Sequence, residues 1–233
     1  MSTILKSRLN APRTLGIANL AVFLFVIAVP VAAQTVIRVA PFRSVDLHSG
    51  GEVILRYGST QRVTLLKGDT DCARVMTDDA GRLVIDKYSA QCHRKYDLKI
   101  EVVAPHFADV AVNDGGHINS IGDFPRQPEI RTAVRNGGSI DLRTIPADRV
   151  IASVAQGGRI LVKPQTVLTA SVADGGQITY WGEPRVEKSI QHGGAINKGT
   201  AADLNEPISE AATCVSERST PAPTSGRRRS WIF

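Results

Sequence analysis

Residues 150–163 read Val-Ile-Ala-Ser-Val-Ala-Gln-Gly-Gly-Arg-Ile-Leu-Val-Lys, and this stretch decides the fold. Val150 and Val154 fall on one side of an extended chain before the glycines, and Ile160 and Val162 do so after them. Alternation with a period of two residues is typical of β-strands, because successive side chains point to opposite faces. We therefore predict two strands of about five residues that meet at the glycine pair.

The same phrase, apolar-x-x-Gly-Gly-x-Ile, occurs five times between residues 107 and 199, and its doublets start 22, 20, 18 and 18 residues apart. A period of about 20 residues is typical of solenoids. We therefore predict an all-β protein, a single-stranded parallel β-helix with coils of about 18–22 residues. The structural corner glycines are Gly115, Gly116, Gly137, Gly138, Gly157, Gly158, Gly175, Gly176, Gly193 and Gly194.

Stacking such coils would align two apolar columns that a single coil cannot bury. We expect Val112, Val134, Val154, Val172 and Ile190 in one column, and Ile118, Ile140, Ile160, Ile178 and Ile196 in the other. Glycine accepts positive φ without steric cost, which suits a corner. Prolines, which lack a ladder N–H, predict a second corner outside the strands, at Pro125 or Pro128, Pro146, Pro164 and Pro184.

Residues 1–33 resemble a bacterial-type secretory signal peptide rather than part of the fold. Three basic residues precede an apolar run from Leu15 to Ala33, and Val31-Ala32-Ala33 offers small residues for cleavage before Gln34. The alternative interpretation is an uncleaved membrane anchor, because the run approaches the roughly 20 residues of a membrane span. Cleavage would leave an exported protein, in the periplasm, at the cell surface or secreted, without an integral membrane span.

The leader also accounts for half of the net charge, since it holds three basic residues and no acid. Its removal lowers the formal charge from +6 to +3. A net charge of this size does not indicate nucleic-acid binding.

The chain has three cysteines, which can form disulfides in an exported protein. Cys72 and Cys92 lie 20 residues apart around the expected strand Arg82–Ile85, and we predict a disulfide between them. A metal site of Cys72, Cys92 and His93 is the alternative, although it lacks the usual ligand spacing. Cys214 would remain as the odd thiol.

The segment before the repeat also has strand patterns, with Gly50-Gly51 as an isolated early copy of the corner. Leu47 precedes this doublet by three residues and Val53 follows it by two. We find no helical period between residues 34 and 199.

This order of segments resembles the head GIN domain family of auto-transporter adhesins, exported bacterial proteins whose domain otherwise has no known function. The resemblance covers roughly residues 38–198 and rests on FRSVDLHSGGEVILRYGSTQRVTL (42–65), GRLVI (81–85), YDLKIEVVAP (96–105), the coils and IQHGGAINKG (190–199). It implies a β-helix domain at residues 34–199, outside the cytoplasm.

The corners depart from the family pattern, which commonly has serine before the doublet. Here that residue is Asp114, Asn136, Gln156, Asp174 or His192, and serine only at position 49. No binding role of the corner serines therefore transfers, and the family supplies no catalytic residue. Residues 200–233 are rich in Pro, Ser, Thr and Ala, and predict a disordered tail that ends in Arg227-Arg228-Arg229-Ser230-Trp231-Ile232-Phe233.

Catalysis on a β-helix would require paired carboxylates. Asp114 and Asp174 occupy equivalent corners but would lie about 14 Å apart at a coil spacing near 4.8 Å. Asp123, Asp141 and Asp148 have no matching offsets, and His117 and His192 lie beside corners without a ligand pattern. No repeat-in-toxin calcium pattern is present. The sequence thus suggests no catalytic, cofactor or metal site.

The outward residues of the coils remain as the candidate surface. We expect one polar ladder of Asn113, Arg135, Ala155, Ala173 and Gln191, and another of His117, Ser139, Arg159, Gln177 and Ala195. Such faces suit an extended polymer or a protein. The leading hypothesis is a non-catalytic binding or adhesion-like module whose partner is an envelope protein or polysaccharide. The alternatives are a polysaccharide-active enzyme on a β-helix scaffold and a structural envelope protein that makes contact only through its tail.

Overall fold

The computed structural model describes residues 34–87 and 97–201, and this part of the chain is all-β. It contains no helix, and so none that could cross a membrane. The predicted leader and most of the predicted tail lie outside the described residues. The strands before the repeat are β1 (Thr35–Ile37), β2 (Ser44–His48), β3 (Glu52–Tyr57), β4 (Arg62–Lys67), β5 (Ala73–Thr77), β6 (Arg82–Lys87) and β7 (Lys99–Ala104).

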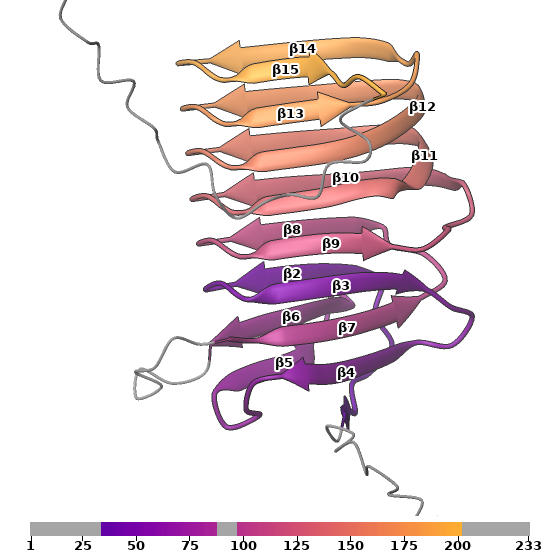
Figure 1. Cartoon of the computed structure of the whole chain (residues 1–233), viewed down its shortest axis with the longest axis vertical. Helices are drawn as coiled ribbons and strands as arrows, with labels where there is room; N and C mark the ends of the chain where they lie inside the picture. Colours follow the sequence, from indigo (N-terminus) through magenta and orange to yellow (C-terminus); the bar gives the residue numbers. More distant parts are fainter. Residues whose placement is uncertain (1–33, 88–96, 202–233) are drawn as a thin grey trace, which may run out of the picture. The chain divides into compact units, whose positions relative to one another are not determined.

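The repeat region supplies eight further strands, which are β8 (Asp109–Asn113), β9 (His117–Ile121), β10 (Gln127–Arg135), β11 (Ser139–Ala155), β12 (Arg159–Ala173), β13 (Gln177–Tyr180), β14 (Arg185–Gln191) and β15 (Ala195–Lys198). Figure 1 shows these strands in stacked layers, with β14 and β15 at one end of the stack. Each layer has one strand on each of two faces.

Parallel ladders connect the layers on both faces. On the first face, β6, β2, β8, β10, the C-terminal parts of β11 and β12, and β14 pair in that order. On the second face, β7, β3, β9, the N-terminal parts of β11 and β12, β13 and β15 pair in the same way. The long strands β11 and β12 therefore each contribute to two successive layers.

The two predicted apolar columns lie in register through these ladders. The first also includes Ile85 and Leu47, and the second includes Ile100 and Val53. Every member is at most 1% exposed, except in the terminal layer, where Ile190 is 48% and Ile196 is 5% exposed. Burial of each aliphatic side chain contributes roughly 1.5–3 kcal/mol, so the columns are the main apolar core of the stack.

The two glycines of a doublet have different roles. Both members of every predicted pair have positive φ, from 84° to 110°. A Cβ on Gly157 would meet no atom within 4 Å, whereas a Cβ on Gly158 would lie 2.5 Å from Val134 Cγ1 and 3.0 Å from the Gly138 carbonyl oxygen. The first glycine is needed for the turn, and the second also lets one layer approach the next.

The expectation of a purely parallel β-helix is wrong before the repeat, because the sheet is mixed. β1 pairs antiparallel with β4, β4 with β7, and β5 with β6. Chain order and layer order also differ there, since β2 and β3 lie between the layer of β6 and β7 and that of β8 and β9. Gly50-Gly51 is therefore not isolated, and β6 and β7 form a layer that the doublet pattern could not reveal.

Two further predictions are only partly correct. One placed the prolines outside the strands, and the other gave the strands a length of about five residues. Pro146 lies within β11, which is 17 residues long, and Pro164 lies within the 15-residue β12. The ladder shifts register between Leu142 and Pro146 and again between Ala147 and Arg149. The chain thus bends without leaving the sheet, and this irregularity accommodates a residue with no N–H.

Two lysines occupy inward positions in the terminal layer. Lys188 is in register with Ala170, and Lys198 with Tyr180. The Lys188 Nζ donates to the Ile196 carbonyl at 3.0 Å and lies 5.6 Å from the centre of the Tyr180 ring, while Lys198 pairs with Glu183. Charged groups at the last layer oppose further strand addition at this edge.

Candidate functional site: corner ladder and surface hollows

The residues that precede the doublets form a ladder of bends along the stack. Ser49, Asp114, Asn136, Gln156, Asp174 and His192 all have φ between 52° and 61°, the left-handed region. From layer to layer, the backbone N–H of each of the first five donates to a carbonyl in an adjacent layer at 3.1 Å. Asn and Asp tolerate this conformation because their short polar side chains bond locally, which explains three of the six corner residues.

The corner carboxylates are bound by different partners. The Asn136 side chain donates to Asp114 at 2.6 Å, and His192 Nδ1 lies 3.2 Å from Asp174. Three layer steps separate Asp114 from Asp174, as the register of the intervening corners shows. The structure therefore does not bring the two carboxylates together.

The other candidate carboxylates also lie apart. Asp141 accepts hydrogen bonds from Arg143 Nε and Nη2, and the two side chains are 14% and 12% exposed. Arg143 lies over the Trp181 ring, 5.5 Å from its centre. Asp148 pairs with Arg126, while Asp123 is exposed in the irregular segment between β9 and β10. Asp141 and Arg143 thus form a mostly buried ion pair within β11.

Both predicted polar ladders lie in register on the side of the strands that faces away from the columns, but Ser139 is only 5% exposed. His117 is half-buried, and its Nδ1 lies 2.7 Å from Ser139 Oγ in the next layer. Arg135 and Arg159 are exposed. Side chains on such a surface are held at the spacing of the strands, roughly 4.8 Å per layer.

Cys72 is disulfide-bonded in the structure. The predicted partner Cys92, together with His93 and Cys214, lies outside the described residues, so the pairing stays a prediction.

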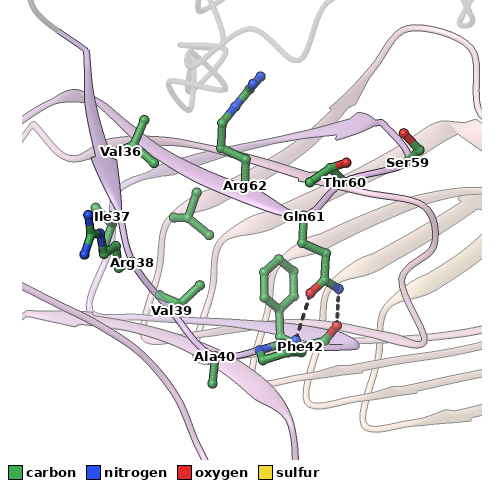
Figure 2. Close-up of a pocket in the computed structure, with 12 residues that line it drawn as sticks. Val36, Ile37, Arg38, Val39, Ala40, Phe42, Ser59, Thr60, Gln61 and Arg62 are labelled. Atoms are coloured by element: carbon green, nitrogen blue, oxygen red, sulfur yellow. Dashed lines mark hydrogen bonds between the residues drawn. The ribbon is translucent and has the colours of Figure 1, made fainter.

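A first surface hollow lies where the chain enters the sheet, between residues 36–42 and 59–63 (Figure 2). Its volume is about 670 Å³, and its lining is mainly aliphatic on the side of Val36, Ile37 and Val39. Gln61 holds the two walls together, because its side chain accepts from the Phe42 N–H at 3.2 Å and donates to the Phe42 carbonyl. These hydrogen bonds connect the segment that enters the sheet to the start of β4.

A second hollow of about 390 Å³ lies at the N-terminal ends of β6, β2 and β8, beside β10. Its size is within the usual range of ligand sites. Three arginines and one aspartate are among the residues that line it, which are Arg43, Ser44, Ala80, Arg82, Ala108, Asp109 and Arg131. We call it the arginine hollow.

The polar groups of the arginine hollow come from four consecutive layers. Arg82, Ser44, Asp109 and Arg131 are in register across β6, β2, β8 and β10. Ser44 is only 5% exposed, and its hydroxyl donates to Asp109 Oδ2 at 2.8 Å. Arg131 Nη1 lies 3.7 Å from Asp109 Oδ1, so the carboxylate is held between a hydroxyl and a cation.

Sequence reasoning missed this hollow because only Asp109 and Arg131 belong to the five-coil repeat, where each lies three residues before its column valine. Arg43 and Arg82 are 39 positions apart and come before the five coils. Only the insertion of β2 between β6 and β8 places them together. The arginines at the start of two strands with an apolar pattern could be seen in the sequence, but the pairing of those two strands could not.

Comparisons with known proteins give structural similarities only. A "putative adhesin" from Bacteroides fragilis is 15% identical with a TM-score of 0.45, and the alignment covers 72% of this chain and 96% of that one. A "putative lipid binding protein" from Parabacteroides distasonis is 17% identical with a TM-score of 0.28, over 72% and 96%. A "putative cell adhesion protein" from Clostridium sporogenes is 10% identical with a TM-score of 0.34, over 71% and 98%.

No protein-family model and no curated protein matches the chain. Similarities at these identities and TM-scores transfer no activity or ligand to this chain.

Proposed function

We propose that this chain is an exported, non-catalytic binding or adhesion-like module of the cell envelope, built on a β-solenoid of the head GIN type. The observation that carries the proposal is the register of the outward side chains over successive parallel layers. A ladder of this kind holds polar groups at a constant spacing on a scaffold whose interior is packed. The surface can therefore contact an extended partner without reorganising.

The leader pattern at residues 1–33 supports export, and the resemblance over residues 38–198 supports the family assignment. Both rest on sequence. The partner class that follows is an envelope polysaccharide or an envelope protein, because these are the extended molecules that an exported module meets.

The test uses the purified full chain against a glycan array and against isolated envelope fractions. We expect saturable binding that survives washing and disappears on denaturation. Binding to no glycan and no envelope component would overturn the proposal. The alternative is a polysaccharide-active enzyme. It would be established if the chain released new chain ends from a panel of polysaccharides and Asp114→Asn or Asp174→Asn abolished this release.

A further inference from the structure

We propose that the arginine hollow binds an acidic polysaccharide, with its guanidinium groups on the carboxylates of uronic acid residues. The inference rests on the proposed function and names the ligand class and the place where it binds. The backbone beneath the hollow is hydrogen-bonded from layer to layer. Arg43 N–H donates to the Gly81 carbonyl at 2.9 Å, Ala108 N–H to that of Arg43 at 2.8 Å, and Arg131 N–H to that of Ala108 at 2.9 Å.

This continuous ladder leaves the side chains as the groups that can contact a ligand. The three arginines are carried on a hydrogen-bonded floor, so their Cα positions are fixed relative to one another. Arg82 and Arg131 are three layers apart, roughly 14 Å at the usual strand spacing, with Ser44 and Asp109 in the two layers between. The charged column runs along the stack and suits a polymer that lies in the same direction.

The arginines retain capacity for an anion. Arg43 is exposed and has no carboxylate within 4.0 Å among the residues of 34–87 and 97–201. Arg82 is 54% exposed and uses its Nε on Asp78, and Arg131 is 57% exposed and pairs with Glu129 and Asp109. A guanidinium has five N–H donors, so each group can still donate to a carboxylate, preferentially through two parallel hydrogen bonds.

The carboxylate within the hollow selects among polyanions. Asp109 is an acceptor fixed by Ser44, and it repels a surface made only of negative acceptors. Lipid phosphates and the side chains of an acidic peptide are such acceptors. A uronic acid ring instead combines a carboxylate, for the arginines, with hydroxyl donors, for Asp109. No large apolar residue lines the hollow, so it offers nothing to acyl chains.

The experiment measures binding of the full chain to polygalacturonate by calorimetry at low ionic strength. Neutral dextran, polyglutamate and phosphatidylglycerol vesicles are the comparison ligands. We expect polygalacturonate to bind best, Arg43→Gln to weaken it about tenfold and Arg43→Gln/Arg131→Gln about a hundredfold, because one charged hydrogen bond is equivalent to about one decade of affinity. Raising the salt to 0.15 M should weaken wild-type binding, since the Debye length falls to about 8 Å.

Arg62→Gln is the matched control, because it removes the same charge from an exposed position in β4, outside both the arginine hollow and the two polar ladders. It should change the affinity by less than about twofold, which is within the effect of a distant screened charge. Arg227→Gln/Arg228→Gln/Arg229→Gln measures attraction by the basic C-terminus. Circular dichroism and urea titration of each variant separate lost binding from lost folding.

Several results would overturn the inference. They include equal affinities of Arg43→Gln and Arg62→Gln, stronger Arg43-dependent binding to polyglutamate or vesicles, and polygalacturonate binding that depends only on the C-terminal arginines. Binding to dextran that does not depend on Arg43 would also overturn the inference, but it would leave the proposed function as a binding module intact. Binding to no polymer and no envelope fraction would remove the proposed function as well.

Discussion

The layers formed by residues 109–198 and the segment formed by residues 34–104 bury the same apolar columns by different means. In the first region each layer follows its predecessor in the chain, and a glycine doublet marks the bend between the two strands of every layer. In the second, β1, β4 and β5 pair antiparallel, and the layer of β2 and β3 is enclosed by strands that come later in the sequence. The difference shows that column packing, rather than the doublet, is what all layers share.

Column packing should therefore respond equally to truncation in both regions. Ile140→Ala and Ile100→Ala each remove a side chain that is 0% exposed in the same column, and each should cost about 4 kcal/mol of unfolding free energy. Ile190→Ala, in the half-exposed terminal layer, should cost roughly 1 kcal/mol. Urea denaturation of the three variants measures these differences.

A much smaller loss for Ile100→Ala than for Ile140→Ala would contradict this view. It would show that the irregular layer packs less tightly than the regular ones, and that the shared column is only geometric.

Substitutions at the bends should destabilise the two regions to different extents, whereas substitutions in the columns should not. A Cβ on Gly158 would lie 2.5 Å from Val134 Cγ1, whereas a Cβ on Gly51 would come no closer than 3.2 Å to Leu98. Gly158→Ala should cost roughly 2–5 kcal/mol from positive-φ strain and overpacking, and Gly51→Ala roughly 1–3 kcal/mol. Thermal or urea unfolding tests the order of the two.

Gly157→Ala serves as the control for backbone strain alone, because nothing lies within 4 Å of its added Cβ. If Gly157→Ala and Gly158→Ala cost the same, close approach between layers is not what requires the second glycine.

The smallest expected effect concerns the turn that leads into β6. The pKa of Asp78 is lowered from its ordinary 3.8, first by the backbone N–H of Arg82 and then by the Arg82 side chain and the Ala80 N–H, against the opposing effect of burial. A depressed carboxylate pKa contributes stability above the unfolded-state pKa, and this contribution is lost as the pH falls through the folded-state value.

Asp78→Asn should accordingly lower the melting temperature slightly at neutral pH. The gap between wild type and variant should close as the pH falls through the lowered pKa, because the wild-type carboxyl is then neutral as well. A gap that stays constant from neutral to strongly acidic pH would mean that the charge on Asp78 is not what the turn uses.

The regular half of the fold could be predicted because its information is local. Val154, Gly157, Gly158 and Ile160 lie within seven residues and recur, so period-two alternation and the doublet indicate strands, bends and the two columns. Their all-β class and their register are confirmed.

The sequence by itself determined that aliphatic residues would align beneath one another at glycine bends, because one layer with that alternation exposes an apolar face until another covers it. Only the tertiary structure decided that β2 lies between β6 and β8, and hence that Arg43, Arg82 and Arg131 share a hollow. Strand pairing between distant segments depends on which edges remain free once the other layers have packed. No local pattern records that competition.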